Sequence, residues 1–147
     1  MTGFVDREVR QDVADVLVRY ASGIDGRDWE LFRTCFTDDC EADYDAIGAW
    51  RGADESTEWL RRVHDPCCHT LHRITNQAVT IRGDGVSARS YVDALIMFAD
   101  NQSGTRAAGF YDDELVAADG GWKIARRRFT SVLLQLVPDR TLLSLEG

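Results

Sequence analysis

The chain has no long apolar run. Its opening segment, MTGFVDREVRQDV, lacks the basic start and the apolar stretch of a signal peptide. No window of the sequence approaches the roughly 20 apolar residues that a membrane-spanning helix needs. We therefore expect a cytoplasmic protein that has no membrane partner.

The sequence also lacks an excess of basic charge. Lysine and arginine together number 17, against 25 aspartates and glutamates, which gives a formal net charge of -8. A surface that follows the phosphates of DNA or RNA needs clustered basic side chains. Nucleic acid is therefore not the expected partner.

The chain has only four cysteines, too few for the dense disulfide framework of a small secreted domain. In a reducing compartment such side chains stay as thiols, and neighbouring Cys67 and Cys68 are poorly placed for a disulfide with each other. We expect four free thiols, with Cys67 and Cys68 as small buried hydrophobic side chains.

The segment PCCHTLHRITN at 66–76 nevertheless concentrates cysteine and histidine, which are zinc ligands. Structural zinc sites usually space their ligands as Cys-x2–4-Cys or His-x3–5-His, and this segment has neither spacing. On a strand, Cys68 and His72 would lie about 13 Å apart, and His69 would point to the other face. The spacing therefore predicts no metal site.

What the chain does have is a set of helical patterns followed by a set of strand patterns. With 147 residues, 44% of them hydrophobic, it suits one domain over residues 1–147. Apolar side chains at helical spacing, and a short strand with a turn, predict elements at 6–24, 28–36, 40–52 and 53–65. After Pro66, strands separated by turn signals are predicted at 69–81, 86–99, 105–118 and 122–137.

This order predicts an α+β fold. Consecutive strands joined by short turns form a meandering antiparallel sheet, and the preceding helices can cover only one of its faces. A curved sheet closed by helices on its concave side leaves a pocket, which is where chemistry is expected.

His72 and Asp25 are the first candidates for chemistry. Alternation places His72 on one strand face with Ile74 and Asn76, although a lone histidine on such a face is more often a core residue than a catalyst. Asp25 follows a helix that carries Tyr20, and a carboxylate beside an imidazole fixes its tautomer and supports its protonated form. The same aspartate in GIDGRD also fits a simple turn, because Asp-Gly is a common turn pair.

Three stretches of the chain resemble the SnoaL-like families of the nuclear-transport-factor-2-like superfamily, over about Val9 to Leu136. They are VLVRYASGIDGRDWELFRTCFTDDC, HTLHRITNQAVTIRGDGVSARSYVDA and GFYDDELVAADGGWKIARRRF. Members such as scytalone dehydratase, bile-acid dehydratase and hexachlorocyclohexane dehydrochlorinase bind a small hydrophobic substrate in a cone-shaped pocket. The resemblance implies a cone-shaped α+β barrel, with N-terminal helices packed on a strongly curved, mainly antiparallel sheet, and no metal or organic cofactor.

The resemblance also implies site residues. The histidine and aspartate of the family's dyad fall on His72 and Asp25, and a catalytic tyrosine falls on Tyr20. LHRITN reproduces a His-x-x-x-Asn spacing that makes Asn76 a second element. A further acid of one relative falls close to Asp93, one position out of register.

A basic residue on the last long strand assists the leaving group in relatives. It falls in the arginine run at 126–128, and Arg128 is the candidate if alternate arginines share the inner face. Tyr44 and Tyr91 could polarise a carbonyl or a leaving oxygen, although strand tyrosines with their hydroxyls in water are as common. Phe110 is an expected contact of the substrate.

The expected function is that of a cofactor-independent lyase or isomerase, dehydratase-like, acting on a small hydrophobic or polycyclic substrate. A polyketide-cyclase-like enzyme and a non-catalytic small-molecule-binding module are the alternatives. The dehydrochlorinase has a lysine on its first helix where this chain has Val18 or Arg19, which counts against dehydrochlorination itself. Relatives assemble through the outer sheet face, and apolar residues at 132–137, with Leu142 and Leu143, predict a homodimer or homotrimer.

Overall fold

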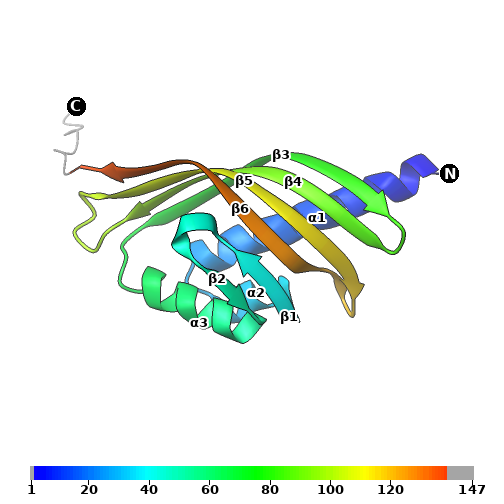
Figure 1. Cartoon of the computed structure of the whole chain (residues 1–147), viewed down its shortest axis with the longest axis horizontal. Coiled ribbons are helices and arrows are strands. Elements are labelled where there is room, and N and C mark those ends of the chain that lie inside the picture. Colours follow the sequence, from blue (N-terminus) through cyan, green and yellow to red (C-terminus); the bar gives the residue numbers. More distant parts are fainter. Residues whose placement is uncertain (1, 139–147) are drawn as a thin grey trace, which may run out of the picture.

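The computed structural model describes residues 2–138, and their side chains from residue 6 onward. Its helices are α1 (Thr2–Asp25), α2 (Trp29–Arg33), α3 (Ala53–His64) and the 3-10 helix η1 (Asp45–Ile47) (Figure 1). Its strands are β1 (Phe36–Asp43), β2 (Ala49–Arg51), β3 (Thr70–Arg82), β4 (Gly85–Met97), β5 (Gly104–Ala118) and β6 (Gly121–Val137). Within these residues, no helix is long and apolar enough to cross a lipid bilayer.

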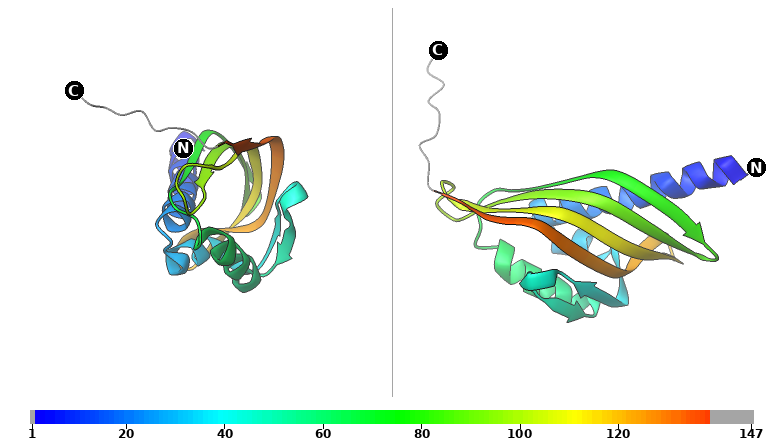
Figure 2. Two further views of the ribbon diagram at one scale, coloured as in Figure 1. Left: turned by 90° about the vertical axis from the view of Figure 1, so that its left-hand side faces the viewer. Right: turned by 45° about the horizontal axis from the view of Figure 1, so that its top comes forward.

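The strands form one six-stranded sheet in the order β2-β1-β6-β5-β4-β3. Strand β1 runs parallel to β6, and every other neighbouring pair is antiparallel. The sheet curls into an open arch, with the helices against its concave side (Figure 2). This confirms the predicted fold class, a cone-shaped α+β fold with a strongly curved, mainly antiparallel sheet, although the cone stays open.

Helix α1 buries one stripe of side chains against the sheet. The stripe consists of Val13, Val16, Leu17, Tyr20 and Ile24. These positions recur every three or four residues, so they share one helical face. The helix ends because Arg27 adopts a left-handed φ of 56°, and the amide of Asp28 donates to the Gly23 carbonyl at 2.8 Å. This turn leaves Asp25 at the end of α1, within reach of β3.

Strand β1 begins earlier than the sequence pattern predicts. Phe36, expected at the end of the second helix, and residues 37–39, expected between that helix and the next strand, belong to β1, and Phe36 pairs with Ile124 of β6. The amide of Ile124 donates to the carbonyl of Cys35 at 2.8 Å, which draws the chain into the sheet directly after α2. The result is a parallel strand pair that the expected four-stranded meander does not include.

Two of the β-bulges in the sheet decide where candidate site residues face. On β3 the register shifts after Thr75, where Asn76 adopts a left-handed φ of 54°. On β6 it shifts between Ile124 and Arg126. One extra residue reverses the alternation of side chains beyond the bulge. Strict alternation therefore assigns the wrong face to the residues after each bulge.

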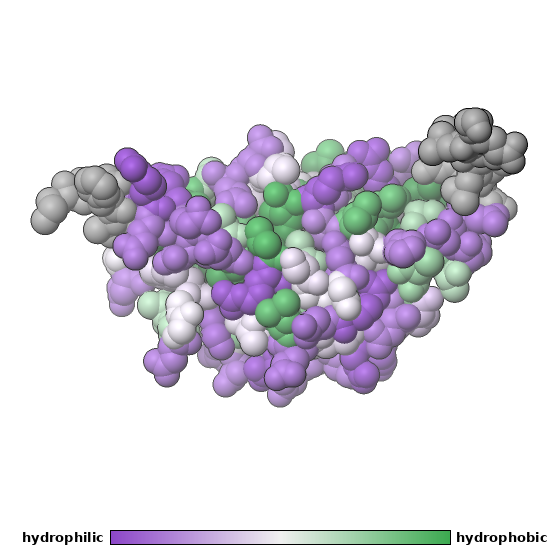
Figure 3. All heavy atoms as spheres, turned by 180° about the vertical axis from the view of Figure 1, so that it is seen from behind, coloured by the Kyte–Doolittle hydropathy of each residue, from purple (hydrophilic) through white to green (hydrophobic). Residues whose placement is uncertain are grey.

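The outer surface agrees with the high content of charged residues. Charged residues make up 29% of the chain. Seen from behind, hydrophilic side chains cover most of the molecule and hydrophobic ones gather in a few groups (Figure 3). A mainly apolar cavity lies instead inside the arch.

Candidate active site

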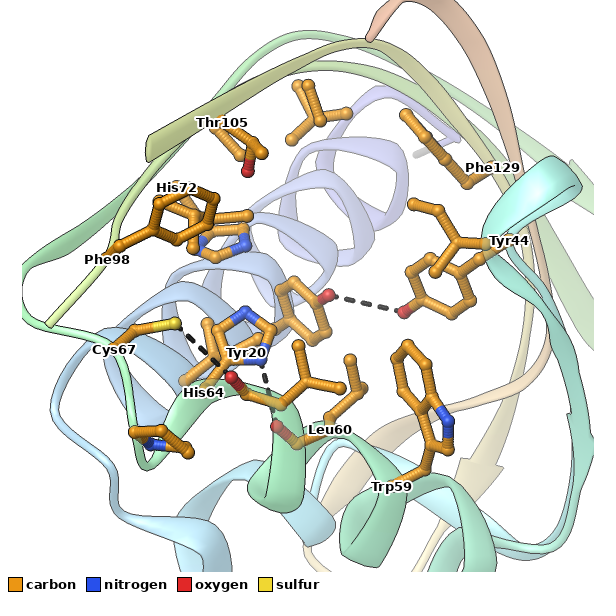
Figure 4. A pocket seen from close by; sticks show the side chains of 18 of the residues that line it. Tyr20, Tyr44, Trp59, Leu60, His64, Cys67, His72, Phe98, Thr105 and Phe129 are labelled. Atoms are coloured by element: carbon orange, nitrogen blue, oxygen red, sulfur yellow. Dashed lines mark hydrogen bonds between the residues drawn. The ribbon is translucent and has the colours of Figure 1, made fainter. Parts of the chain in front are cut away.

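A mainly apolar cavity of about 560 Å³ lies between the concave face of the sheet, α1 and α3 (Figure 4). Its polar lining is confined to a few side chains, which include Tyr20, Tyr44, His64, His72 and Tyr111. Small-molecule sites typically have volumes of about 300–1,000 Å³ and a few polar groups on an apolar wall. The cavity therefore has the size and lining of a site for a small, largely apolar molecule.

His72 lines this cavity, and the carboxylate of Asp25 contacts its imidazole. The Nδ1 atom of His72 lies 2.7 Å from Oδ1 of Asp25. The other carboxylate oxygen accepts from the backbone amide of His72 at 2.8 Å, and the Thr70 hydroxyl donates to Oδ1 at 2.9 Å. Three donors thus fix the carboxylate, and the carboxylate fixes the imidazole.

The carboxylate also decides the tautomer of His72. Burial alone would raise the pKa of Asp25, but the hydrogen bonds from His72 and Thr70 outweigh it and lower that pKa below its ordinary value. An ionised carboxylate can only accept, so Nδ1 of His72 carries the proton. In the neutral imidazole, Nε2 is then left with a free lone pair, as a general base requires.

Arg27 secures the turn beside this pair. Its guanidinium donates to the carbonyl of Ile24 at 2.8 Å, to the hydroxyl of Thr70 at 2.9 Å and to the carbonyl of Cys68 at 2.8 Å. One side chain therefore ties the end of α1 to the start of β3, the two elements that supply Asp25 and His72.

Three tyrosine hydroxyls meet at another wall of the cavity. The hydroxyl of Tyr20 lies 3.2 Å from that of Tyr44 and 3.3 Å from that of Tyr111. Burial raises the pKa of all three phenols, so they stay protonated near neutral pH. Two hydrogen bonds among three hydroxyls use two protons, which leaves one O–H free to donate to a ligand.

Arg127 lies behind the tyrosines and not in the cavity lining. It is 0% exposed, and it forms a two-pronged ion pair with Asp113 at 2.7 and 2.8 Å. Its guanidinium carbon lies 4.3 Å from the centre of the Tyr20 ring and 3.8 Å from that of Tyr111. The cation therefore holds two of the phenol rings in place by stacking.

A family model described as a SnoaL-like domain matches residues 6–128 of this sequence. The chain belongs to the SnoaL-like family. An uncharacterized protein of Mycobacterium tuberculosis strain H37Rv is 32% identical over 120 residues, which cover 80% of this chain and 82% of that protein.

Solved structures with the same fold agree with this membership. A protein from Novosphingobium aromaticivorans, named as a candidate scytalone dehydratase, has a TM-score of 0.84 and 22% identity, over 100% of this chain and 99% of that one. The hexachlorocyclohexane dehydrochlorinase of Novosphingobium barchaimii has a TM-score of 0.78 and 19% identity, over 96% of both chains. At these identities the likeness concerns the fold.

Several residues that the SnoaL-like resemblance singled out lie outside the cavity. Asn76 is exposed at the β3 bulge, and Arg128 is exposed beside an outer groove. Tyr91, Asp93 and Phe110 line a groove elsewhere on the surface. Their expected position in the pocket is wrong.

The register of the strands explains why Arg128, Tyr91 and Asp93 face outward. The bulge between Ile124 and Arg126 reverses the alternation on β6, so that Arg127 turns inward and Arg128 outward. On β4, buried Val92 lies between Tyr91 and Asp93 and occupies the inner face. Asp93 instead forms ion pairs on the outer side of the sheet.

His64 is a lining residue that the sequence pattern did not single out. His64 is only 4% exposed, whereas the neighbouring Val63, which also lines the cavity, is 41% exposed. Spacing of four residues from buried Ser56 and Leu60 was the available signal. Tyr111 and Asp113 were also missed, although both alternate with buried Leu115 on β5.

The cysteines differ from expectation in one respect. All four are free. Cys35 and Cys40 are buried, but Cys67 and Cys68 are only partly buried, so their expected place in the core is wrong. Cys67 lies at the cavity wall, where its thiol donates to the Val63 carbonyl at 3.2 Å. Among residues 2–138, no group of three or more histidine, cysteine or acidic side chains could hold a metal ion.

Proposed function

We propose that this protein is a cofactor-independent lyase or isomerase of the dehydratase type, acting on a small, mainly apolar substrate. The observation that carries the proposal is the 2.7 Å contact between His72 and Asp25 at the wall of the apolar cavity. A binding module without catalysis has no need of an imidazole held by a carboxylate fixed by three donors. The names of the structural relatives, a candidate scytalone dehydratase and a dehydrochlorinase, support the same class.

In the proposed reaction, Nε2 of His72 takes a proton from an acidic C–H bond of the substrate. Asp25 stabilises the imidazolium that forms, because it already accepts from Nδ1. The electron pair of the C–H bond forms a new double bond, and a hydroxide departs from the adjacent carbon. The hydroxide leaves as water with the proton that the imidazolium gives back, which restores neutral His72 and balances the step.

The tyrosines supply electrostatic help. The free O–H of the cluster formed by Tyr20, Tyr44 and Tyr111 can donate to an oxygen that gains negative charge. We assign Arg127, in place of Arg128, to a positioning role, since it stacks on Tyr20 and Tyr111 without lining the cavity. A positioned base contributes about 10²–10⁴-fold, and one oxyanion donor about 10²–10³-fold.

The test uses a panel of mainly apolar β-hydroxy ketones in D2O, with mass spectrometry to detect loss of water and uptake of deuterium. We expect turnover of at least one compound by the wild type. His72→Gln and Asp25→Asn should each lower that rate by at least about 100-fold, because they remove the base or its support. His69→Gln is the matched control, since His69 is an exposed histidine outside the cavity. Full activity of either dyad variant would rule out the mechanism.

We also propose that the protein forms a homodimer or homotrimer through the end of β6. Val132 and Leu136 are 73% and 72% exposed, and Leu134 is half-exposed. Exposed apolar groups of this kind usually mark an interface. Leu142 and Leu143, which contribute to the same expectation, lie outside the described residues. Light scattering should give a dimeric or trimeric mass for the wild type and a lower one for Val132→Lys, and a monomeric wild type would contradict the proposal.

A further inference from the structure

His64 is the last residue of α3, and its imidazole forms part of the cavity wall. Its Nδ1 atom lies 2.9 Å from the carbonyl oxygen of Leu60, one helical turn earlier. In Figure 4 the ring lies between Leu60 and His72, and the centres of the two imidazole rings are 5.9 Å apart. A second imidazole therefore adjoins the proposed general base.

The contact with Leu60 fixes the tautomer of His64. A carbonyl oxygen can only accept a hydrogen bond, so Nδ1 must carry the proton and donate it. Nε2 is then bare, and it is buried without any hydrogen-bond partner among the described residues. Burial also lowers the pKa of His64 to about 4, although the bond to Leu60 opposes this, so the ring stays neutral near pH 7.

A buried acceptor without a partner is costly, and it is rare in native proteins. The imidazole cannot relieve this cost by adopting the other tautomer. If the proton moved to Nε2, Nδ1 would face the carbonyl oxygen of Leu60 with a lone pair. A ligand that brings a hydrogen-bond donor into the cavity can relieve it. A ketone or ether oxygen at the same place would meet Nε2 with a second lone pair and be disfavoured.

We propose that the substrate carries a hydroxyl group that donates a hydrogen bond to Nε2 of His64, close to the carbon that His72 deprotonates. The second half of this statement rests on the proposed function, while the hydroxyl site itself does not. The hydroxyl is one that the product retains, because a bare nitrogen cannot supply the proton that a departing hydroxide needs. The oxygen that leaves or gains charge then faces the phenols of the tyrosine cluster, which are donors.

This assignment predicts where the hydrogen-bonding groups of the substrate lie. The histidine wall, formed by His64 and His72, offers two lone pairs, and the tyrosine wall offers one free O–H. The cavity between them is mainly apolar. The matching substrate class is a hydrocarbon body with a hydroxyl on one side and an acceptor oxygen on the other.

The test compares 2-naphthol with 2-methylnaphthalene, which has nearly the same size but no donor. Dissociation constants are measured by equilibrium dialysis for the wild type and for His64→Phe. The dissociation constant of 2-methylnaphthalene is divided by that of 2-naphthol for each protein. This ratio should be about tenfold larger in the wild type than in His64→Phe, which is the fold-change expected for one neutral hydrogen bond. Val63→Ala is the matched control, since Val63 lines the cavity through an apolar side chain, and it should keep the wild-type ratio.

A second measurement does not depend on the variant folding. In the wild-type protein, two-bond ¹H–¹⁵N spectra should show the Nδ1–H tautomer of His64, and 2-naphthol but not 2-methylnaphthalene should shift the Nε2 resonance. The proposal would be overturned if the ratio of dissociation constants were equal in the wild type and His64→Phe. It would also be overturned if addition of 2-naphthol did not shift the Nε2 resonance. A preference that disappears in His72→Phe and persists in His64→Phe would overturn it as well.

The two proposals fail separately. Neither ligand undergoes elimination, so the affinity ratio should be unchanged in Asp25→Asn even if that variant keeps full turnover and the dyad mechanism is wrong. Loss of the hydroxyl preference, in turn, says nothing against proton abstraction by His72.

Discussion

Stability should fall between pH 7 and pH 4.5 because of His64. Burial lowers the pKa of His64 to about 4 in the folded protein, whereas a histidine in an unfolded chain has a pKa of about 6.5. Between these values the unfolded chain binds a proton that the folded protein does not, so each step toward acid favours unfolding. For this one side chain, the loss from pH 7 to pH 4.5 is about 2 kcal/mol.

The assay is urea unfolding at both pH values, with the free energy obtained by linear extrapolation. His64→Phe changes the stability at pH 7, but only the difference between the two pH values matters. That difference should be about 2 kcal/mol smaller in His64→Phe than in the wild type. His69→Gln, which removes an exposed histidine, should behave as the wild type does. Equal pH dependence of wild type and His64→Phe would refute a neutral, buried His64.

Three further predictions concern the rest of the molecule. Arg127→Met should lower the unfolding free energy by about 3–5 kcal/mol, because it strands a buried carboxylate, while Arg128→Met on the surface should change it by less than about 0.5 kcal/mol; equal effects would contradict the inward turn of Arg127. Gly109→Ala should cost about 1–3 kcal/mol by the same measurement, since a methyl group there would overlap a backbone carbonyl of β6; an unchanged stability would argue against that close approach. Alkylation of the native protein, followed by mass spectrometry, should spare Cys35 and Cys40, whose burial raises their thiol pKa to about 11, and modify the other two cysteines; labelling of all four at one rate would contradict their burial.

Periodicity in the sequence predicted the elements whose pattern is uninterrupted. The apolar stripe of α1 is a regular helical repeat, and the structure contains that helix. Alternation along β3 correctly places His72 on the inner face, because no irregularity separates it from the start of the strand. The resemblance then associated His72 with Asp25, and the structure places the two side chains in contact.

The failures come from single-residue irregularities and from partners that are distant in sequence. A bulge needs only one extra residue, and nothing in the run at 126–128 distinguishes the inward arginine from its neighbours. The inward orientation of Arg127 depends on its ion pair with Asp113, on another strand, and on the aromatic rings stacked against its guanidinium. His64 was passed over for a different reason: a histidine in a charged helical segment is not itself apolar, and only its spacing of four residues from buried Leu60 marked it.

The contact between Asp25 and His72 joins positions 47 residues apart in the chain. Closing a flexible loop of that length costs about 3 kcal/mol in chain entropy, beyond a constant term. Neither α1 nor β3 alone can hold the pair, so it forms only when the sheet docks on the helix. During refolding, recovery of activity would therefore report the late docking of the sheet on α1. The helical circular dichroism signal would report the earlier formation of the helix.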